Sequence, residues 1–98
     1  MHARVSTIYG TTEQGDTGTR SFRDEILPAL QQTEGCKGAA LLTNRSTGKT
    51  VAITLWEDEQ AMEASEEAAN TMRQQAADEY AATEPPMVDR YEVVVWEV

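Results

Sequence analysis

The chain alternates between two hydrophobic patterns. Short segments place apolar and polar side chains in turn, as β-strands do, and two longer segments repeat an apolar side chain every three or four residues, as helices do. The alternating pattern predicts strands over 2–10, within 36–56 and over 89–98. The longer repeat predicts helices within 19–35 and from 58 to about 82. Within 36–56, the Asn-, Ser- and Gly-containing stretch at 44–49 favours a turn, so this segment is predicted to be a hairpin.

The first helix has a proline in its interior. Turn-forming residues over 11–18 predict a loop before it, and Gly35 can adopt the left-handed conformation that stops a helix. Pro28 has no backbone N–H to donate to the carbonyl of Asp24, so we expect a bend there. The apolar repeat continues to Leu30, which predicts that the helix does not end at the proline.

The second helix has a clear start and end. Asp58 precedes it as an N-cap, and the prolines of 83–88 cannot continue it. Ser65, followed by two glutamates, could restart the helix after a bend. Its apolar stripe is predicted to comprise Met62, Ser65, Ala69, Met72, Ala76 and Tyr80.

The resulting order, β-α-β-β-α-β, is typical of an α+β, ferredoxin-like fold. We predict a single domain over 1–98, with a four-stranded antiparallel sheet and both helices on one face. The strands within 50–56 and 89–98 are apolar on both faces, so the other face of the sheet needs a partner. A homodimer that pairs sheet to sheet into a barrel would provide it.

Composition and charge narrow the function classes. The hydrophobic fraction of 40% and the charged fraction of 26% are typical of globular proteins. No apolar run is long enough for a membrane span, no signal peptide is recognisable, and Cys36 is the lone cysteine, so we expect a cytoplasmic protein. Residues 57–98 carry two Lys or Arg against twelve Asp or Glu, and the net charge of the chain is −9. Such a field disfavours nucleic acid and anionic membrane surfaces as partners.

Three stretches of the chain carry a family resemblance, namely "FRDEILPAL", then "EGCKGAALLTNRSTGKTVAITLWEDEQAMEASEEAA", and finally "YEVVVWEV". Together they resemble the antibiotic biosynthesis monooxygenase family of dimeric α/β barrels. The shared marks are the helix ending in Leu-Pro-Ala-Leu, the glycines at the entry to the second strand, and the strand that ends in Trp56-Glu57. The resemblance implies sheet-to-sheet dimers. The family's superfamily includes cofactor-free oxygenases of aromatic polyketides, haem-degrading enzymes and members with no established activity. The resemblance therefore does not by itself assign a reaction.

Trp56 is the leading candidate for a site residue. The resemblance implies that it lines a pocket between sheet and helices, where an indole could stack on an aromatic ligand and donate a hydrogen bond. The alternative is an ordinary core residue where strand meets helix. Thr54 shares its face by alternation and stands where the family's oxygenases carry an asparagine. The other candidates for the pocket are Tyr9, Tyr80, Tyr91, Arg4 and Arg90.

Cofactor and metal chemistry finds little support in the residues. The family's haem-degrading branch implies a histidine on the second helix, but 58–84 contains none and the chain's one histidine is His2, which disfavours haem degradation. "STGKT" lacks the first glycine of a phosphate-binding loop and precedes a strand. No cluster of His, Cys and carboxylates predicts a metal site.

Two hypotheses therefore remain. In the first, the chain is a homodimeric, cofactor-independent monooxygenase-like protein with a small apolar pocket for an aromatic ligand beside Trp56. In the second, it is a non-catalytic binding or structural module of the same fold, with a pocket filled by its own side chains.

Overall fold

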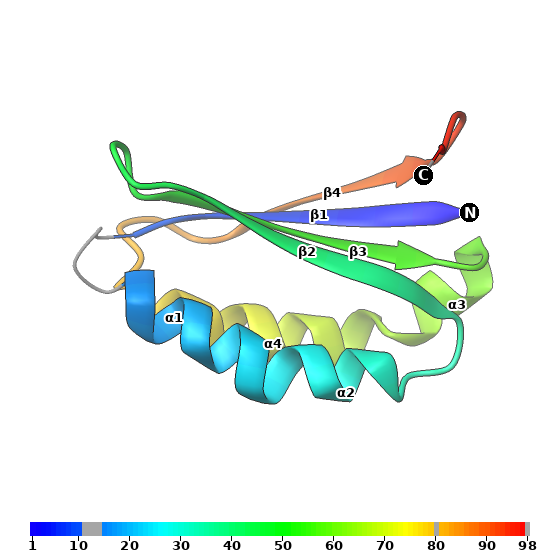
Figure 1. Cartoon of the computed structure of the whole chain (residues 1–98), viewed down its shortest axis with the longest axis horizontal. Coiled ribbons are helices and arrows are strands. Elements are labelled where there is room, and N and C mark those ends of the chain that lie inside the picture. The colour runs from blue at the N-terminus through cyan, green and yellow to red at the C-terminus, as the bar shows by residue number, and fades with distance from the viewer. Residues whose placement is uncertain (11–14, 80, 98) are drawn as a thin grey trace.

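The computed structural model describes residues 1–10, 15–79 and 81–97, which form one layer of strands and one layer of helices (Figure 1). In chain order the elements are β1 (His2–Tyr9), α1 (Gly15–Ser21), the π-helical turn η2 (Phe22–Ile26), α2 (Leu27–Gln31), β2 (Cys36–Asn44), β3 (Lys49–Trp56), α3 (Glu59–Ala64), α4 (Glu66–Glu79) and β4 (Met87–Glu92).

The sheet has the strand order β2-β3-β1-β4, and every neighbouring pair is antiparallel. Both helical segments cover the same face of the sheet (Figure 1). This confirms the predicted ferredoxin-like α+β fold and the β2–β3 hairpin. The register places Arg4 of β1 opposite Thr54 of β3 on one side and opposite Arg90 of β4 on the other.

A π-helical turn accommodates Pro28. The N–H of Leu27 donates to the carbonyl of Phe22, five residues earlier, and Pro28 falls in the first turn of α2, where its missing N–H costs least. The helix continues to Gln31, so the prediction that it passes Leu30 is confirmed. The predicted loop over 11–18 is wrong for 15–18, because helix α1 begins at Gly15. Positions 11–14 lie outside the described residues.

Gly35 is left-handed, as expected, but it does not end the helix. Its φ is +83°, and it lies at the entry to β2, after a turn that follows Gln31. Its carbonyl accepts a 2.7 Å hydrogen bond from the N–H of Glu57, immediately after Trp56. The predicted helix end was therefore a few residues too late, and Gly35 instead connects two parts of the chain next to Trp56.

The start and the bend of the second helical segment are confirmed. The carboxylate of Asp58 accepts a 2.8 Å hydrogen bond from the N–H of Ala61, which is an N-cap interaction. The segment is interrupted at Ser65, where α3 ends and α4 begins. The hydroxyl of Ser65 donates a 2.7 Å hydrogen bond to the carbonyl of Met62, so the interruption is stabilised locally.

The predicted strand over 89–98 is wrong in its bounds, because β4 runs only from Met87 to Glu92. In its pairing with β1, Glu92 is opposite His2, the first residue of that strand, so the register between the two described strands ends there. The N–H of Val93 still donates to the carbonyl of Met1, at 2.9 Å, and then the pairing stops. Val94 and Val95 are 82% and 83% exposed, and Trp96 is 58% exposed. Val98 lies outside the described residues.

The two faces of the sheet differ. Between sheet and helices, Leu30, Trp56 and Met62 form a buried cluster, against which Phe22, Ile26, Cys36, Ala39 and Ala61 pack. The other face has no helix over it (Figure 1). Large apolar side chains of β2 and β4 remain about half exposed, namely Leu42, Met87 and Tyr91.

We expect Gly35→Ala to lower the free energy of unfolding by about 1–3 kcal/mol, because an added Cβ conflicts with both the backbone and the neighbouring helix. The positive φ is strained for alanine, and the new Cβ would lie 2.5 Å from Cβ of Ala61. Gly38→Ala is the matched control, since its Cβ would make an ordinary 3.6 Å contact with Leu55. Urea unfolding of the two variants measures the difference. Equal stability of the two variants would contradict the prediction.

Candidate functional site: a cavity between sheet and helices

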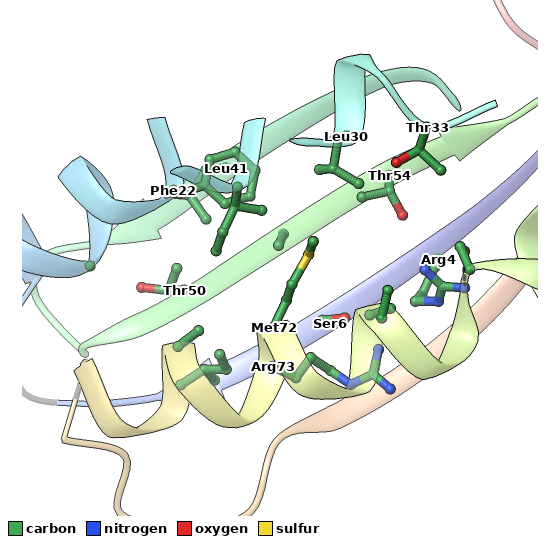
Figure 2. Close-up of a pocket in the computed structure, with 18 of the residues that line it drawn as sticks. Arg4, Ser6, Phe22, Leu30, Thr33, Leu41, Thr50, Thr54, Met72 and Arg73 are labelled. Atoms are coloured by element: carbon green, nitrogen blue, oxygen red, sulfur yellow. Dashed lines mark hydrogen bonds between the residues drawn. The ribbon is translucent and has the colours of Figure 1, made fainter. Parts of the chain in front are cut away.

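A cavity of about 190 Å³ lies between the inner face of the sheet and the helices (Figure 2). Small side chains leave this space open. Ala52 on β3 and Ala68, Ala69 and Ala76 on α4 all line it, and none of them reaches across the gap between the layers. Larger apolar side chains, among them Phe22, Ile26, Leu30, Leu41 and Met72, complete its wall. The cavity is therefore mainly apolar, as small-molecule sites are.

Trp56 belongs to both the core and the wall of this cavity. Its side chain is fully buried and packs in the cluster with Leu30 and Met62, yet it also borders the open space. Its indole N–H donates a 2.9 Å hydrogen bond to Oγ1 of Thr54, which lines the cavity as well. The indole donor is thus satisfied within the protein. The Thr54 hydroxyl, which accepts this bond, retains its own proton for donation.

Arg4 is a buried cation at one end of the cavity. Its Nη2 lies 2.7 Å from the carbonyl oxygen of Met62, 2.8 Å from Oγ of Ser65 and 2.9 Å from Oε1 of Glu66. These three partners surround the junction between α3 and α4. The guanidinium also lies 5.5 Å from the centre of the Trp56 ring, within the range of a cation–π interaction. Arg4 therefore fixes the helical layer to β1 directly beside Trp56.

Glu66 bridges two arginines. Arg90 of the edge strand donates to it through Nε at 2.8 Å and through Nη2 at 2.7 Å, while Arg4 binds Oε1. The hydrogen bonds from Arg90 are the main cause that lowers the pKa of Glu66 to about 2, and the hydrogen bond and charge of Arg4 add to it. Burial of the carboxylate acts in the opposite direction. The same pairing raises the pKa of Arg90. Both oxygens of this carboxylate are occupied.

Arg73 of α4 is the second arginine that lines the cavity. Figure 2 shows it reaching from the helix toward the end where Arg4 lies. Its Nη1 is buried and has no hydrogen-bond partner among the described residues, and the same holds for Nε of Arg4. Burial, and then the nearby charge of Arg4, lower the pKa of Arg73. This end of the cavity thus contains buried donors that lack acceptors.

Three of the sequence-predicted candidates, Trp56, Thr54 and Arg4, line the cavity. Arg90 lies outside it and faces Glu66, because β4 is an edge strand. Tyr9 and Tyr91 are also outside its lining, since odd-numbered positions of β1 and their cross-strand partners alternate away from Arg4, Ser6 and Ile8. Lys49 approaches the ring of Tyr9 at 5.8 Å, and Tyr91 is 53% exposed. Tyr80 lies outside the described residues.

Arg73 is the residue that the sequence analysis missed. It stands four residues after Ala69 and eight after Ser65, so helical periodicity places it on the side of α4 that faces the sheet. Charged residues of a helix are usually assigned to its solvent-exposed side. The spacing of Arg73 from the apolar stripe was the sequence signal that could have placed it on the other side, facing the sheet.

Outside this cavity, a shallow hollow of about 520 Å³ is outlined by His2, Glu59, Met62, Glu63, Glu66, Arg90, Tyr91 and Glu92. His2 Nε2 lies 4.0 Å from Glu59 Oε2. Within 1–10, 15–79 and 81–97, no group of three or more His, Cys, Asp or Glu side chains is placed to hold a metal ion. None of the helices in those ranges has the length and apolar character of a membrane span.

Solved structures share this fold. A monooxygenase of Streptomyces coelicolor, in complex with nanaomycin D, superposes with a TM-score of 0.79 at 13% identity, over 99% of this chain and 90% of that one. A Deinococcus radiodurans protein, provisionally named as an antibiotic biosynthesis monooxygenase, gives 0.75 at 18% identity, over 100% of this chain and 97% of that one. At such low identity the similarity establishes the fold alone. The resemblance inferred from the sequence is confirmed at that level.

By sequence, the chain is similar to proteins without an assigned function. It is 38% identical over 93 residues to the uncharacterised protein Rv2557 of Mycobacterium tuberculosis, which covers 95% of this chain. The chain spans only 41% of the length of that relative. No family model matches the chain.

We expect Glu66→Gln to lower stability at neutral pH by about 1–3 kcal/mol, because it leaves the buried guanidinium of Arg4 without its counter-charge. The pKa of Glu66 is about 2 in the folded chain, against 4.5 for an ordinary glutamate. The stability that Glu66 contributes is therefore fully present above about 4.5 and is lost as pH falls toward 2. Urea midpoints between pH 6 and about 2.5 should fall more steeply for the wild type than for Glu66→Gln.

Glu67→Gln is the matched control for this prediction, since it removes the same charge from the exposed neighbouring position. It should stay within about 0.5 kcal/mol of the wild type. Parallel pH profiles for the wild type and Glu66→Gln would contradict the assigned role of Glu66.

Proposed function

We propose that this chain binds a small, mainly aromatic molecule in the cavity beside Trp56. The observation that carries the proposal is a mainly apolar space of about 190 Å³ that has Thr54, Arg4 and Arg73 toward one end. Other polar residues also line it, among them Thr50 toward the opposite end. An apolar cavity of about 150 Å³ in another protein accepts benzene. One aromatic ring with a small substituent is therefore the ligand size that matches this site.

The proposal is supported by a protein of the same fold, since the Streptomyces coelicolor monooxygenase holds a small molecule, nanaomycin D. The rival hypothesis, a module whose pocket is filled by its own side chains, predicts no such space. The alanines of α4 favour the binding hypothesis, because larger side chains at Ala68, Ala69 and Ala76 would fill the gap.

Cofactor-independent monooxygenation is the second candidate function, and it rests on the fold of the solved monooxygenases. Such a reaction needs groups that stabilise an oxyanion or peroxide as charge develops. The indole N–H of Trp56 already donates to Thr54, and the family's asparagine is replaced by that threonine. The donors left for this role are Thr54 O–H and the arginines. Ligand-dependent oxygen consumption would distinguish turnover from binding.

We also propose that two copies pair through their uncovered sheet faces. Leu42, Met87 and Tyr91 are about half exposed there, and Val94 and Val95 are more than four-fifths exposed. In a lone chain these side chains remain largely in water, whereas a second copy would bury them symmetrically. A stable interface of this kind buries about 1,200 Å² or more in total.

For the ligand site, we expect benzyl alcohol to bind in the cavity and to quench the fluorescence of Trp56. Trp96→Phe provides the background, because Trp96 also emits. Ala69→Leu places extra carbons in the cavity and should weaken binding about tenfold or more, or about 1.4 kcal/mol. Ala77→Leu is the matched control, since Ala77 is on the same helix and does not line the cavity. If no one-ring aromatic probe, benzyl alcohol included, binds the wild type by fluorescence or calorimetry, the site is refuted.

For the assembly, sedimentation equilibrium at micromolar concentration should give twice the chain mass of 10.8 kDa. Leu42→Lys should shift the mass toward that of the monomer without unfolding it, because the side chain is 53% exposed in the single chain. Gln74→Lys, at an exposed position of α4, adds the same charge away from the sheet and should remain dimeric. A monomeric wild type would reject the sheet-to-sheet pairing.

A further inference from the structure

At one end of the cavity, several hydrogen-bond donors lack an acceptor among the described residues. Nη1 of Arg73 and Nε of Arg4 are buried without a hydrogen-bond partner among the residues described. The hydroxyl of Thr54 accepts from Trp56 and therefore has its own proton to donate. Unsatisfied buried donors are rare in folded proteins because each costs free energy. A ligand that brings acceptor oxygens to this end would remove that cost.

The charge balance at this end also favours an anion. Glu66 is the carboxylate beside Arg4, and both of its oxygens are already bound by Arg4 and Arg90. Glu79 also lines the cavity, but it follows Arg73 by six residues, about 9 Å along the helix. Its Oε1 accepts from Ser21 at 3.1 Å and from Gln75 at 3.2 Å. Burial lowers the pKa of Arg73 and the charge of Glu66 acts to raise it, but no carboxylate of the described residues is hydrogen-bonded to Arg73.

We propose that the ligand of this cavity is an aromatic carboxylate, whose carboxylate pairs with Arg73 while its ring occupies the apolar part beside Trp56. The guanidinium presents a planar fork of N–H donors that matches the two oxygens of a carboxylate. This inference rests on the proposed binding function and narrows it to a chemical class. Arg73 is a specificity-determining residue in this arrangement, because a neutral ligand supplies neither the negative charge nor the second acceptor oxygen that the guanidinium can pair with.

Benzoate and benzamide test the proposal, since they have nearly the same shape and differ in charge at neutral pH. Calorimetric titration of the wild type should give an affinity for benzoate about tenfold or more above that for benzamide. Arg73→Met keeps an apolar stem and removes the charge, so it should abolish this preference while leaving the affinity for benzamide unchanged. Arg73→Lys keeps the charge without the fork and should retain part of the preference.

Arg23→Met is the matched control. Arg23 lies on the helical segment η2, is largely exposed and pairs with Asp24 at 3.1 Å, so the variant removes the same charge from a site outside the cavity. It should bind benzoate as the wild type does. If Arg73→Met does not fold, the wild-type comparison and the partial preference of Arg73→Lys decide the question.

The outcomes separate this proposal from the proposed function. Equal affinity of the wild type for benzoate and benzamide, with benzyl alcohol still bound, overturns the carboxylate assignment and leaves the ligand site intact. A benzoate preference that persists in Arg73→Met also overturns the role of Arg73. If none of the three probes binds, both proposals fall.

Discussion

The buried guanidinium of Arg4 is the interaction on which the rest of this structure depends. It extends from the central strand β1 into the junction between α3 and α4, where it meets Met62, Ser65 and Glu66 within hydrogen-bonding distance. A cation so deeply buried is tolerated only when it is paired and hydrogen-bonded. The junction at Ser65 supplies that pairing, and the helical layer is thereby held at a defined position over Trp56.

Two regions of the single chain still lack a binding partner in this arrangement, namely the cavity and the uncovered face of the sheet. The alanines of α4 leave an internal cavity at whose end Arg73 has a buried donor without a partner. On the other side of the sheet, Leu42 and Tyr91 remain exposed. Both features are costly in an isolated chain, since one leaves a buried guanidinium N–H without an acceptor and the other leaves apolar area in water. A small anionic ligand and a second copy of the chain would each complete one of them.

The sequence alone was sufficient for the features that arise from local physics. Alternation and helical periodicity specify the βαββαβ order because each pattern allows only one secondary structure to bury its apolar side. The capping role of Asp58 and the break at Ser65 also follow from short-range hydrogen bonding, and the structure shows both. Periodicity likewise placed Thr54 on the face of Trp56, and a hydrogen bond joins their side chains.

Tertiary structure decided what depends on distant parts of the chain. The end of β4 at Glu92 is set by where β1 begins, and no pattern within the last strand contains that information. Tyr9 and Tyr91 were candidates by residue type, yet register and alternation direct them away from the cavity. Arg73 acquires its importance only from its position near Arg4, which is remote in sequence and already pairs with Glu66. Periodicity states which side of an element a residue occupies. Whether that side meets a partner, a cavity or solvent depends on the packing of elements that the local pattern does not encode.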